Sequence, residues 1–468
     1  MWTNWSGGQS CRPSATVRPL DEAGVAGVVR RAAERGQTVR PVGSGHAFSA
    51  LAVTDDVHVD CSAFSGVTGV HARRGGRTSV RVRAGTTLDE LHTELDARDL
   101  ALAVPLENGA PTVGGALACG MHGSGVGMTS LSEQVLAMRI VDGRGRVRDV
   151  APDDLDAART SLGALGVIVD VELAVVPAAP VTVTRAPRPV DEVLDPALWD
   201  AHAVVEAALF PSARTALLRW ADPLPAARAA ELVGAGGGPV PLTGELLIAD
   251  AVEAASSGRG TSKPAPEPAP EPGKERSVGV TSAGAGARTA LGGALVAERA
   301  LPRLVPRLNR VVSRLARTVT ATGAMHRVLS SPPAVRYEQT EWALPREALA
   351  DAVREVLARL SGDLEPGLPV RMRLGGAENG WLHPAYGRAT GWIAVRAPRG
   401  TDPGPVLGAA SEVLAAHGGR PHWGSRHDLV AADVLALYPR AADFLRVRDD
   451  YDPDRVFANP ALESLLGS

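Results

Sequence analysis

Two glycine-rich segments constrain this 468-residue chain more than any other feature of its sequence. The first segment reads VGSGHAFS over residues 42–49 and directly follows a short β-like run. The second reads GGALACGMHGSGVG over residues 114–127, with six glycines in fourteen positions. Because glycine adopts backbone angles that other residues avoid, successive N–H groups can converge on an anion or approach a flat ligand closely. One such turn is weak evidence, but two predict a large phosphorylated ligand that lies across both.

The residues around the glycine-rich segments alternate between helical and strand-like patterns. Asp21 is placed to cap a helix that runs to about Arg35, and Thr87 with Glu90 forms a capping box for a second helix. Strands that alternate with helices indicate an α/β or α+β domain over about residues 12–178. The further elements expected there are strands over residues 38–42, 57–60 and 79–83, a hairpin turn at Asp142-Gly143, and a buried strand within residues 161–176.

Composition excludes several classes of protein. The 49 Lys+Arg and 52 Asp+Glu residues leave a net charge of −3, so the chain lacks the basic excess of a dedicated nucleic-acid binder. No apolar run approaches the roughly 18 residues of a membrane-spanning helix, and the first ten residues lack the pattern of a secretory signal. Cys11, Cys61 and Cys119 are too few and too scattered for a disulfide framework or a metal site, which favours a cytoplasmic protein.

The second half of the chain has longer strand and helix patterns, which predict a second core from about residue 179. Residues 255–288 are rich in Pro, Glu, Gly and Ala, lack apolar periodicity, and are expected to form a flexible insertion. Both lysines of the chain, Lys263 and Lys274, lie in this insertion, so every cationic Lys or Arg side chain elsewhere is an arginine.

Residues 304–319, which follow the insertion, predict a basic amphipathic helix. Such a helix suits either peripheral contact with an anionic membrane surface or a solvated face on the second core. The sequence leaves both alternatives open and predicts at most peripheral membrane contact. The arginines that form the basic side are Arg307, Arg310, Arg314 and Arg317.

The two glycine-rich segments, together with four further segments, resemble the vanillyl-alcohol oxidase/p-cresol methylhydroxylase superfamily of flavoproteins. Within it the chain is most similar to the branch of sugar-1,4-lactone and alditol oxidases, which includes D-arabinono-1,4-lactone oxidase and L-gulonolactone oxidase. The motifs follow the family order along nearly the whole chain, the insertion excepted. The four further segments are SLGALGVI (161–168), WLHPAYGR (381–388), RPHWG (420–424) with LYPR (437–440), and DPDRVFANP (452–460).

The resemblance implies a two-domain α+β protein with a FAD-binding fold of the p-cresol methylhydroxylase type. Residues 12–178 would bind FAD, residues 179–417 would form a cap domain with a large antiparallel sheet, and residues 418–468 would return to complete the flavin site. No metal site is implied. The cofactor-binding residues that the resemblance implies are Val42, Gly43, Ser44, Gly45, His46, Ala47, Ser49, Gly114, Gly115, Gly120, His122, Gly123, Ser124, Gly125, Gly166 and Ile168.

His46 stands in the middle of the first glycine-rich segment, where a bulky imidazole is unusual. In many relatives the histidine at this position is bonded covalently to the 8α-methyl group of the flavin, which suits a neutral imidazole nitrogen as the nucleophile. The next residue in the family is usually serine, whereas this chain has Ala47. The resemblance therefore implies covalent FAD through His46, with tight noncovalent FAD as the alternative.

The implied reaction is hydride transfer from a carbinol C–H of a small-molecule substrate to flavin N5. Members of the branch carry a Glu-x-Arg pair on a strand and a lysine after an HWG motif. This chain retains Arg373, but it has Arg371 in place of the glutamate and Ser425 in place of the lysine. These changes raise the local charge from about +1 to about +2, and an isolated buried cation is costly. We therefore consider two alternatives: an acidic substrate such as a sugar acid, or an Arg371 that turns to solvent.

Three further expectations concern the proton acceptor, the part played by Glu341 and the electron acceptor. His422 and His427 are candidates to accept the carbinol proton, although such histidines more often satisfy hydrogen bonds in a core. Glu341 is expected to belong to a strand and to play no catalytic part. The implied electron acceptor is O2; a dehydrogenase that uses a quinone or cytochrome, and a flavin-binding protein that has lost turnover, are the alternatives.

Overall fold

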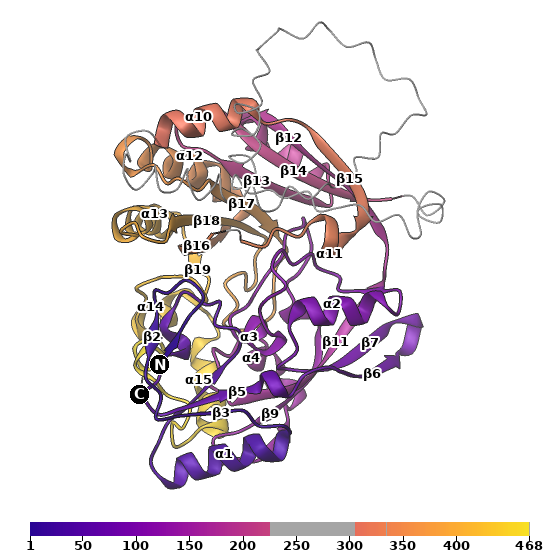
Figure 1. Ribbon diagram of the computed structural model, residues 1–468, viewed down its shortest axis with the longest axis vertical. Coiled ribbons are helices and arrows are strands. Elements are labelled where there is room, and N and C mark those ends of the chain that lie inside the picture. The colour runs from indigo at the N-terminus through magenta and orange to yellow at the C-terminus, as the bar shows by residue number, and fades with distance from the viewer. Residues whose placement is uncertain (225–304, 334, 468) are drawn as a thin grey trace, which may run out of the picture.

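The computed structural model describes residues 1–224, 305–333 and 335–467. Figure 1 shows the N-terminal half in the lower part of the molecule and a large sheet in the upper part. In the part of the chain that is described, no helix combines the length and the apolar character that a membrane crossing requires. The insertion predicted at residues 255–288, with its two lysines, lies outside the described residues.

A three-stranded parallel sheet in the order β3-β5-β4 opens the N-terminal half. Helix α1 (Glu22–Glu34) packs its valines against the sheet, and the Asp21 side chain caps the helix as predicted by accepting from the Gly24 N–H. Strand β4 leads directly into the first glycine-rich segment. The strands are β3 (Ala15–Val17), β4 (Val39–Val42) and β5 (Val57–Asp60).

A second, antiparallel sheet has the order β10-β9-β11-β7-β6, with β8 paired to β11. Both hydrogen bonds of the predicted capping box form at Thr87, where α2 begins. The Asp142-Gly143 turn joins β9 to β10 as predicted. The elements are β6 (Val67–Ala72), β7 (Thr78–Arg83), α2 (Leu88–Asp96), β8 (Leu100–Ala101), α3 (Val113–Ala118), β9 (Val135–Val141), β10 (Val147–Asp149), α4 (Leu155–Ala158) and β11 (Val167–Pro177).

The large sheet has eight strands in the order β15-β12-β14-β13-β17-β18-β16-β19. Helices α12 (Leu349–Arg359) and α13 (Gly404–Ala416) pack their apolar residues on β16, β17 and β18, and Figure 1 shows both helices on one side of the sheet. Its other side faces the N-terminal half. The strands are β12 (Pro180–Pro189), β13 (Val204–Leu209), β14 (Thr215–Pro223), β15 (Val319–Ala324), β16 (Tyr337–Pro345), β17 (Val370–Gly375), β18 (Thr390–Pro398) and β19 (Arg420–Pro421).

The C-terminal segment returns to the N-terminal half (Figure 1). Tyr438, Phe444 and Leu462 belong to the same core as the valines of β7. The Asn459 side chain donates to three backbone carbonyls of residues 50–53, beside the first glycine-rich segment. The helices here are α14 (Ala431–Leu437), α15 (Ala441–Tyr451) and α16 (Pro460–Leu466).

The helix predicted over residues 304–319 is shorter than expected. Helix α10 spans Val305–Leu315, and Val319 already begins β15, because β15 forms the edge of the large sheet beside β12. The chain passes from the second sheet to the large sheet between β11 and β12, close to the predicted domain boundary at residue 178. The remaining short elements are β1 (Trp2–Thr3), β2 (Ser10–Cys11), α5 (Val190–Val193), α6 (Pro196–Asp200) and α11 (Met325–Val328).

Candidate active site

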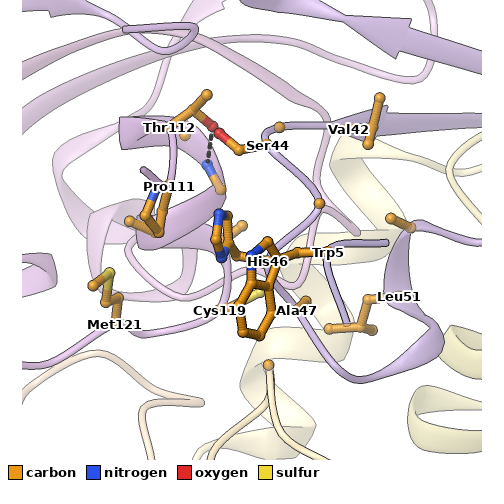
Figure 2. Close-up of a pocket in the computed structure, with 18 of the residues that line it drawn as sticks. Trp5, Val42, Ser44, His46, Ala47, Leu51, Pro111, Thr112, Cys119 and Met121 are labelled. Carbon is orange, nitrogen blue, oxygen red and sulfur yellow. Dashed lines mark hydrogen bonds between the residues drawn. The ribbon is translucent and has the colours of Figure 1, made fainter. Parts of the chain in front are cut away.

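One elongated cavity runs from the two N-terminal sheets to the facing side of the large sheet. At one end its lining includes Arg40 on β4 and Val167 on β11, and at the other end it includes Arg373 on β17. Both glycine-rich segments contribute to the wall between these ends, as Figure 2 shows for Ser44, His46 and the start of α3. The cavity therefore joins the two halves of the fold.

The first glycine-rich segment presents a row of free backbone donors to the cavity. The N–H groups of residues 44–47 donate to no acceptor among the residues that the structure describes. Gly45 has φ +70°, which favours glycine, and a Cβ atom at Gly43 would overlap Thr112 Oγ1. Ser44 Oγ donates to the Ala110 carbonyl at 2.5 Å and ties the segment to the loop before α3. These features fit a phosphate group that approaches the backbone closely.

The second glycine-rich segment has two functions in the fold. Gly114 and Gly115, at the start of α3, line the cavity, and a Cβ at Gly114 would lie 3.0 Å from Ala84 Cβ. The later part of the segment instead contacts the large sheet. There Ser124 Oγ donates to the Val205 carbonyl at 3.1 Å, and Gly125 N–H donates to the Leu374 carbonyl at 2.9 Å.

The structure brings eleven of the sixteen predicted cofactor residues to the cavity wall. The five others lie outside the lining; Ser49 Oγ, for example, donates to the Trp423 carbonyl at 2.7 Å. The residues that line the cavity are Val42, Gly43, Ser44, Gly45, His46, Ala47, Gly114, Gly115, His122, Gly166 and Ile168, and those that do not are Ser49, Gly120, Gly123, Ser124 and Gly125.

The imidazole of His46 lies in the cavity between Trp5 and Asn108. Its ring stacks on the Trp5 ring with 5.4 Å between centroids, and its Nδ1 lies 3.5 Å from Asn108 Nδ2. Burial lowers the pKa of His46, so the ring is neutral at pH 7. A neutral imidazole beside the glycine-rich turn is a competent nucleophile.

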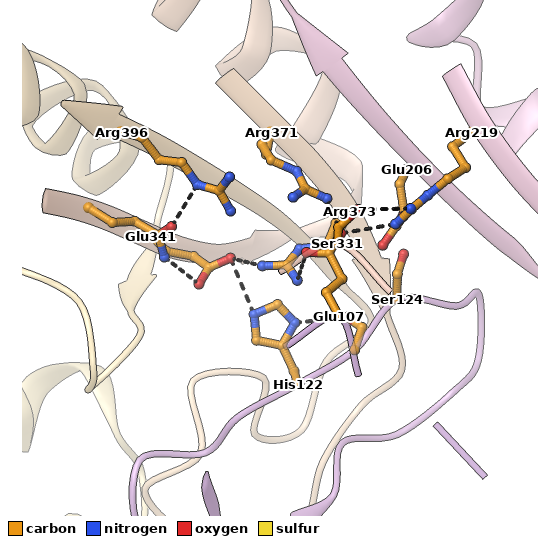
Figure 3. Close-up of polar contacts among 12 residues, drawn as sticks. Glu107, His122, Ser124, Glu206, Arg219, Ser331, Glu341, Arg371, Arg373 and Arg396 are labelled. Carbon is orange, nitrogen blue, oxygen red and sulfur yellow. Dashed lines mark hydrogen bonds and ion pairs between the residues drawn. The ribbon is translucent and has the colours of Figure 1, made fainter. Parts of the chain in front are cut away.

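A network of arginines and glutamates closes the end of the cavity at the large sheet (Figure 3). Arg373 donates to Glu341 on β16, and its Nη1 lies 3.4 Å from the carboxylate of Glu107. Glu107 belongs to the loop between β8 and α3, so the network spans both halves of the chain. Burial alone lowers the pKa of Arg373, but the two carboxylates outweigh it and hold the guanidinium charged.

Arg371 is fully buried and pairs with Glu107, so it neither turns to solvent nor lines the cavity. Glu107 also accepts from Arg219 Nη2 at 2.9 Å, and Arg219 donates to Glu206 as well. Three glutamates thus balance the three arginines at positions 219, 371 and 373. The excess positive charge inferred from the sequence is therefore wrong, because a counter-ion distant in sequence neutralises Arg371.

Glu341 is part of the site, which corrects the expectation that it serves only its strand. It lines the cavity, is almost completely buried, and accepts from Arg373. His122 Nε2 lies 3.4 Å from its Oε1 atom. Burial alone raises the pKa of Glu341, but Arg373 and His122 lower it well below its usual range. Gln339 and Glu341 share one face of a buried strand, and this polar alternation was the available sequence signal.

The structure separates the two histidines predicted to accept a proton. His422 lines the cavity, whereas His427 lies outside the lining with its ring 5.6 Å from that of Trp423. Burial lowers the pKa of each to about 4. The structure therefore leaves His422 in the site and removes His427 from it.

Several cavity residues were not identified from the sequence, and most come from segments without a glycine motif. Ser425, at the position of the family lysine, lies in the cavity, and its Oγ accepts from Gln339 Nε2 at 3.4 Å. Sequence analysis had named Ser425 only as a departure from the family; the polar or aromatic lining residues that it missed are Trp5, Arg40, Phe48, Ser62, Glu107, Asn108, Thr112, Tyr337, Gln339 and Arg396.

The two-part α+β fold and the cavity lined by both glycine-rich segments are those expected of a flavin-binding protein of the p-cresol methylhydroxylase type, and the comparisons with known proteins bear this out. Residues 13–151 match the model of a FAD binding domain, and residues 279–465 match that of D-arabinono-1,4-lactone oxidase. The chain is 33% identical over 473 residues to L-gulono-1,4-lactone dehydrogenase of Mycobacterium tuberculosis, covering 100% of this chain and 99% of that protein. It therefore belongs to the family of FAD-dependent 1,4-lactone oxidoreductases.

Two further comparisons extend this relationship. Mouse L-gulonolactone oxidase is 26% identical over 483 residues and covers 100% of this chain and 98% of its own. The crystal structure of cholesterol oxidase from B. sterolicum superposes with a TM-score of 0.72 at 18% identity, over 99% of this chain and 96% of that one. At this identity the second comparison shows the shared fold alone.

Proposed function

We propose that this protein oxidises a carbinol group of a neutral sugar-derived 1,4-lactone. The proposal is carried by the charge balance at the large sheet, where every arginine of the Arg219, Arg371 and Arg373 group faces a buried carboxylate. Because the charges of this group are balanced, the group gives an anionic sugar acid no advantage over a neutral lactone. The names of the relatives, which are lactone oxidases and a lactone dehydrogenase, support the same substrate class.

FAD fits the cavity, and we assign its pyrophosphate to the free N–H groups of residues 44–47. Gly114 and Gly115 let the cofactor approach α3 closely, while Gly166 and Ile168 line the cavity near the adjacent sheets. When bound, FAD supplies a hydride acceptor at N5. The substrate would then bind at the end of the cavity that residues of β16 and β17 line.

Arg373 is the residue that we assign to the carbinol oxygen. It lines the cavity, and hydrogen bonds or ion pairs with Glu341 and Glu107 fix its guanidinium from two sides. A fixed donor in a buried site stabilises the negative charge that develops on the oxygen as its proton leaves. Arg371 is assigned a positioning role through Glu107, because it does not reach the cavity.

We propose that FAD is attached covalently through His46. The half-buried, neutral imidazole lies within the turn that we assign to the pyrophosphate, stacked on Trp5, which holds its plane. A bond between a ring nitrogen and the flavin 8α-methyl carbon would form as the N–H and one methyl C–H bond break and the flavin ring takes up two electrons and two protons, which O2 would then remove. Such a bond would account for a histidine at this position. Noncovalent FAD is the alternative, and acid precipitation of the native protein distinguishes the two.

O2 is the electron acceptor that we propose, in line with the relatives named oxidases. The similarity over the full chain to a protein named a dehydrogenase favours a second candidate, transfer to a quinone or cytochrome. Loss of turnover is the less favoured alternative, because Glu107 supplies a carboxylate beside Arg373 even though position 371 no longer does.

The test is anaerobic titration of the full chain with neutral 1,4-lactones and with the corresponding sugar acids, followed by flavin absorbance. We expect L-gulono- or D-arabinono-1,4-lactone to bleach the flavin faster than the acids do. Arg373→Met is the control, which should retain reduction by dithionite and lose reduction by lactone. Equal or faster reduction by the acids, or no reduction by any lactone, would overturn the proposal. Peroxide formation under air then separates O2 from another acceptor.

A further inference from the structure

Three histidines surround Trp392, two of them buried and His422 half-buried, and they differ in the hydrogen bonds of their ring nitrogens. His122 Nδ1 lies 2.9 Å from the Gly123 carbonyl, which can only accept, so Nδ1 carries the proton. By contrast, His383 Nδ1 and His422 Nδ1 each accept a backbone N–H, from Ala385 at 3.2 Å and from Gly424 at 3.1 Å. In their neutral forms those two rings therefore carry the proton on Nε2, and only His122 presents an Nε2 lone pair.

The Nε2 atom of His122 is buried without a hydrogen-bond partner among the described residues, and the residue lines the cavity. Its neighbour is Glu341, with Oε1 at 3.4 Å (Figure 3). The His122 ring stacks on Trp392 with 3.5 Å between centroids, which fixes its plane. Nε2 of the neutral ring can therefore take up a second proton, which would lie beside the carboxylate of Glu341.

We propose that His122 accepts the carbinol proton during oxidation and that Glu341 stabilises the imidazolium that results. This inference deepens the proposed function, on which it rests. Ser425 stands in this chain at the position of the family lysine, and the residues that the structure describes include no lysine, so no lysine among them can accept the proton. His122 has the only suitable lone pair of the three histidines near Arg373.

The step balances without an additional reactant. The O–H bond of the carbinol breaks and its proton forms a bond with His122 Nε2. The C–H bond breaks with its electron pair, the hydride goes to the flavin that this family uses, and the carbinol carbon becomes a carbonyl. Arg373 holds Glu341 in place, so the carboxylate stays beside the imidazolium.

The charged groups around His122 favour a neutral ring before the reaction. Burial lowers its pKa and Arg373 acts in the same direction, while Glu341 opposes them. His383 and His422 pack near the same ring, and burial lowers the pKa of both. The rate of flavin reduction should therefore rise with pH through one inflection below 6.5 and stay level above it.

The first test uses His122→Asn, because the asparagine amide can keep the hydrogen bond to Gly123 and lacks the Nε2 lone pair. We expect lactone-dependent flavin reduction to fall by about 100-fold or more, with the acid inflection abolished and reduction by dithionite retained. His417→Asn is the matched control, because His417 Nε2 also faces a glutamate, Glu355 at 2.8 Å, on exposed helices. A rate within threefold of the native rate for His122→Asn would overturn the proposal.

A second measurement does not depend on turnover or on the fold of that variant. In 15N-histidine NMR spectra of the native chain, the His122 signal should show the Nδ1–H tautomer at pH 7, whereas His383 and His422 show Nε2–H. A third and separate test, which does depend on turnover, uses His122→Gly: added imidazole should restore flavin reduction, and the rate should saturate with imidazole concentration. An Nε2–H tautomer for His122 contradicts the proposal. If the native flavin is not reduced by any lactone, the proposed function fails, and the tautomer still tests His122 separately.

Discussion

The carboxylate of Glu107 accepts a hydrogen bond from the guanidinium of Arg371, although the two residues lie 264 positions apart in the chain. Glu107 belongs to a loop of the N-terminal half, and Arg371 belongs to the centre of the large sheet. Burial alone raises the pKa of Glu107, but Arg371, Arg373 and Arg219 outweigh it and hold the pKa well below its usual range. The ion pair therefore joins the two halves of the fold and fixes Arg373 at the cavity.

Removal of this carboxylate should destabilise the protein strongly. Glu107→Gln leaves buried guanidiniums without a full counter-charge, so the free energy of unfolding should fall by about 3–5 kcal/mol in urea titration at pH 7. Adding Arg371→Met should recover part of that loss, because the partner charge disappears as well. Additive effects of the two changes would contradict direct coupling between the residues.

The control for this change is Glu94→Gln, which breaks the exposed pair of Glu94 with Arg98 and should cost no more than about 0.5 kcal/mol. The pH dependence gives a second check. Because the folded-state pKa of Glu107 is depressed, its contribution is complete above the unfolded value near 4.3 and is lost as the pH falls below that value. The difference between native and Glu107→Gln should therefore shrink below about pH 4.

Gly43→Ala should lower the FAD content of the purified protein. A Cβ at this position overlaps Thr112 Oγ1, and relief of the overlap moves the backbone that we assign to the pyrophosphate. We expect a lower ratio of visible to ultraviolet absorbance and weaker retention of FAD after dialysis. Gly43→Ala combined with Thr112→Ala should regain cofactor, because the overlapping hydroxyl is gone.

Gly408→Ala is the matched control for a glycine substitution. Gly408 lies in α13, where an added Cβ meets nothing within 4 Å. Alanine also favours helix by about 1 kcal/mol relative to glycine, so this variant should keep its FAD and gain slightly in thermal stability. Normal cofactor content in Gly43→Ala would refute the close approach at the first glycine-rich segment.

His46→Ala should release the flavin from the polypeptide. After acid precipitation, the yellow colour of the native protein is expected in the pellet and that of His46→Ala in the supernatant. Flavin fluorescence of the band in a denaturing gel measures the same bond. Asn108→Ala is the control, because it keeps His46, removes the 3.5 Å contact with its ring and the hydrogen bond from the Ala110 N–H, and should leave the colour in the pellet. Colour in the native supernatant would establish noncovalent FAD instead.

His92→Phe should make stability less sensitive to acid. The His92 ring on α2 stacks on His326 of α11 with 4.7 Å between centroids, and burial together with His326 lowers the pKa of His92 to about 4. Since the unfolded value is near 6.5, the unfolded chain binds more protons between pH 4 and 6.5, and stability falls as the pH drops through this window. The phenylalanine keeps the ring and removes the titration.

The measurement is the free energy of unfolding in urea at several pH values from 7 to 4. Between pH 6.5 and 4 the native protein should lose about 3 kcal/mol more than His92→Phe. His71→Phe on the exposed strand β6 is the control and should follow the native curve. Parallel curves for native and His92→Phe would show that His92 protonates equally in both states.

Local elements followed closely from the sequence because each depends on contacts between near neighbours. Asp21 caps α1, the Thr87 capping box starts α2, and strand β5 has the predicted bounds of residues 57–60. The family also followed from short motifs, since a glycine turn that binds a phosphate is built from consecutive backbone N–H groups. The helix predicted over residues 304–319 ends at Leu315, because the residues from Val319 onward form β15, which pairs with β12.

The arrangement of the site was less accessible, because it depends on residues far apart in the chain. Glu341 was taken as a strand residue, and only the sheet order, in which β18 separates β16 from β17, and the second glycine-rich segment beside the sheet show that it faces Arg373 and His122. His427 and His422 are five positions apart, yet only His422 reaches the cavity. Sequence distance does not reveal which side chains share a buried volume.

The sequence by itself determined the cofactor class and the retained arginine, because both belong to motifs of consecutive or nearly consecutive residues. The tertiary structure alone decided the charge of the site. Arg371 is positively charged with or without a neighbouring carboxylate, but the free-energy cost of burying that charge depends on the nearest carboxylate. Folding brings the carboxylate of Glu107 to it. Coulomb interactions act through space, so the counter-ion of a buried charge is fixed by the packing of the two halves and not by their order along the chain.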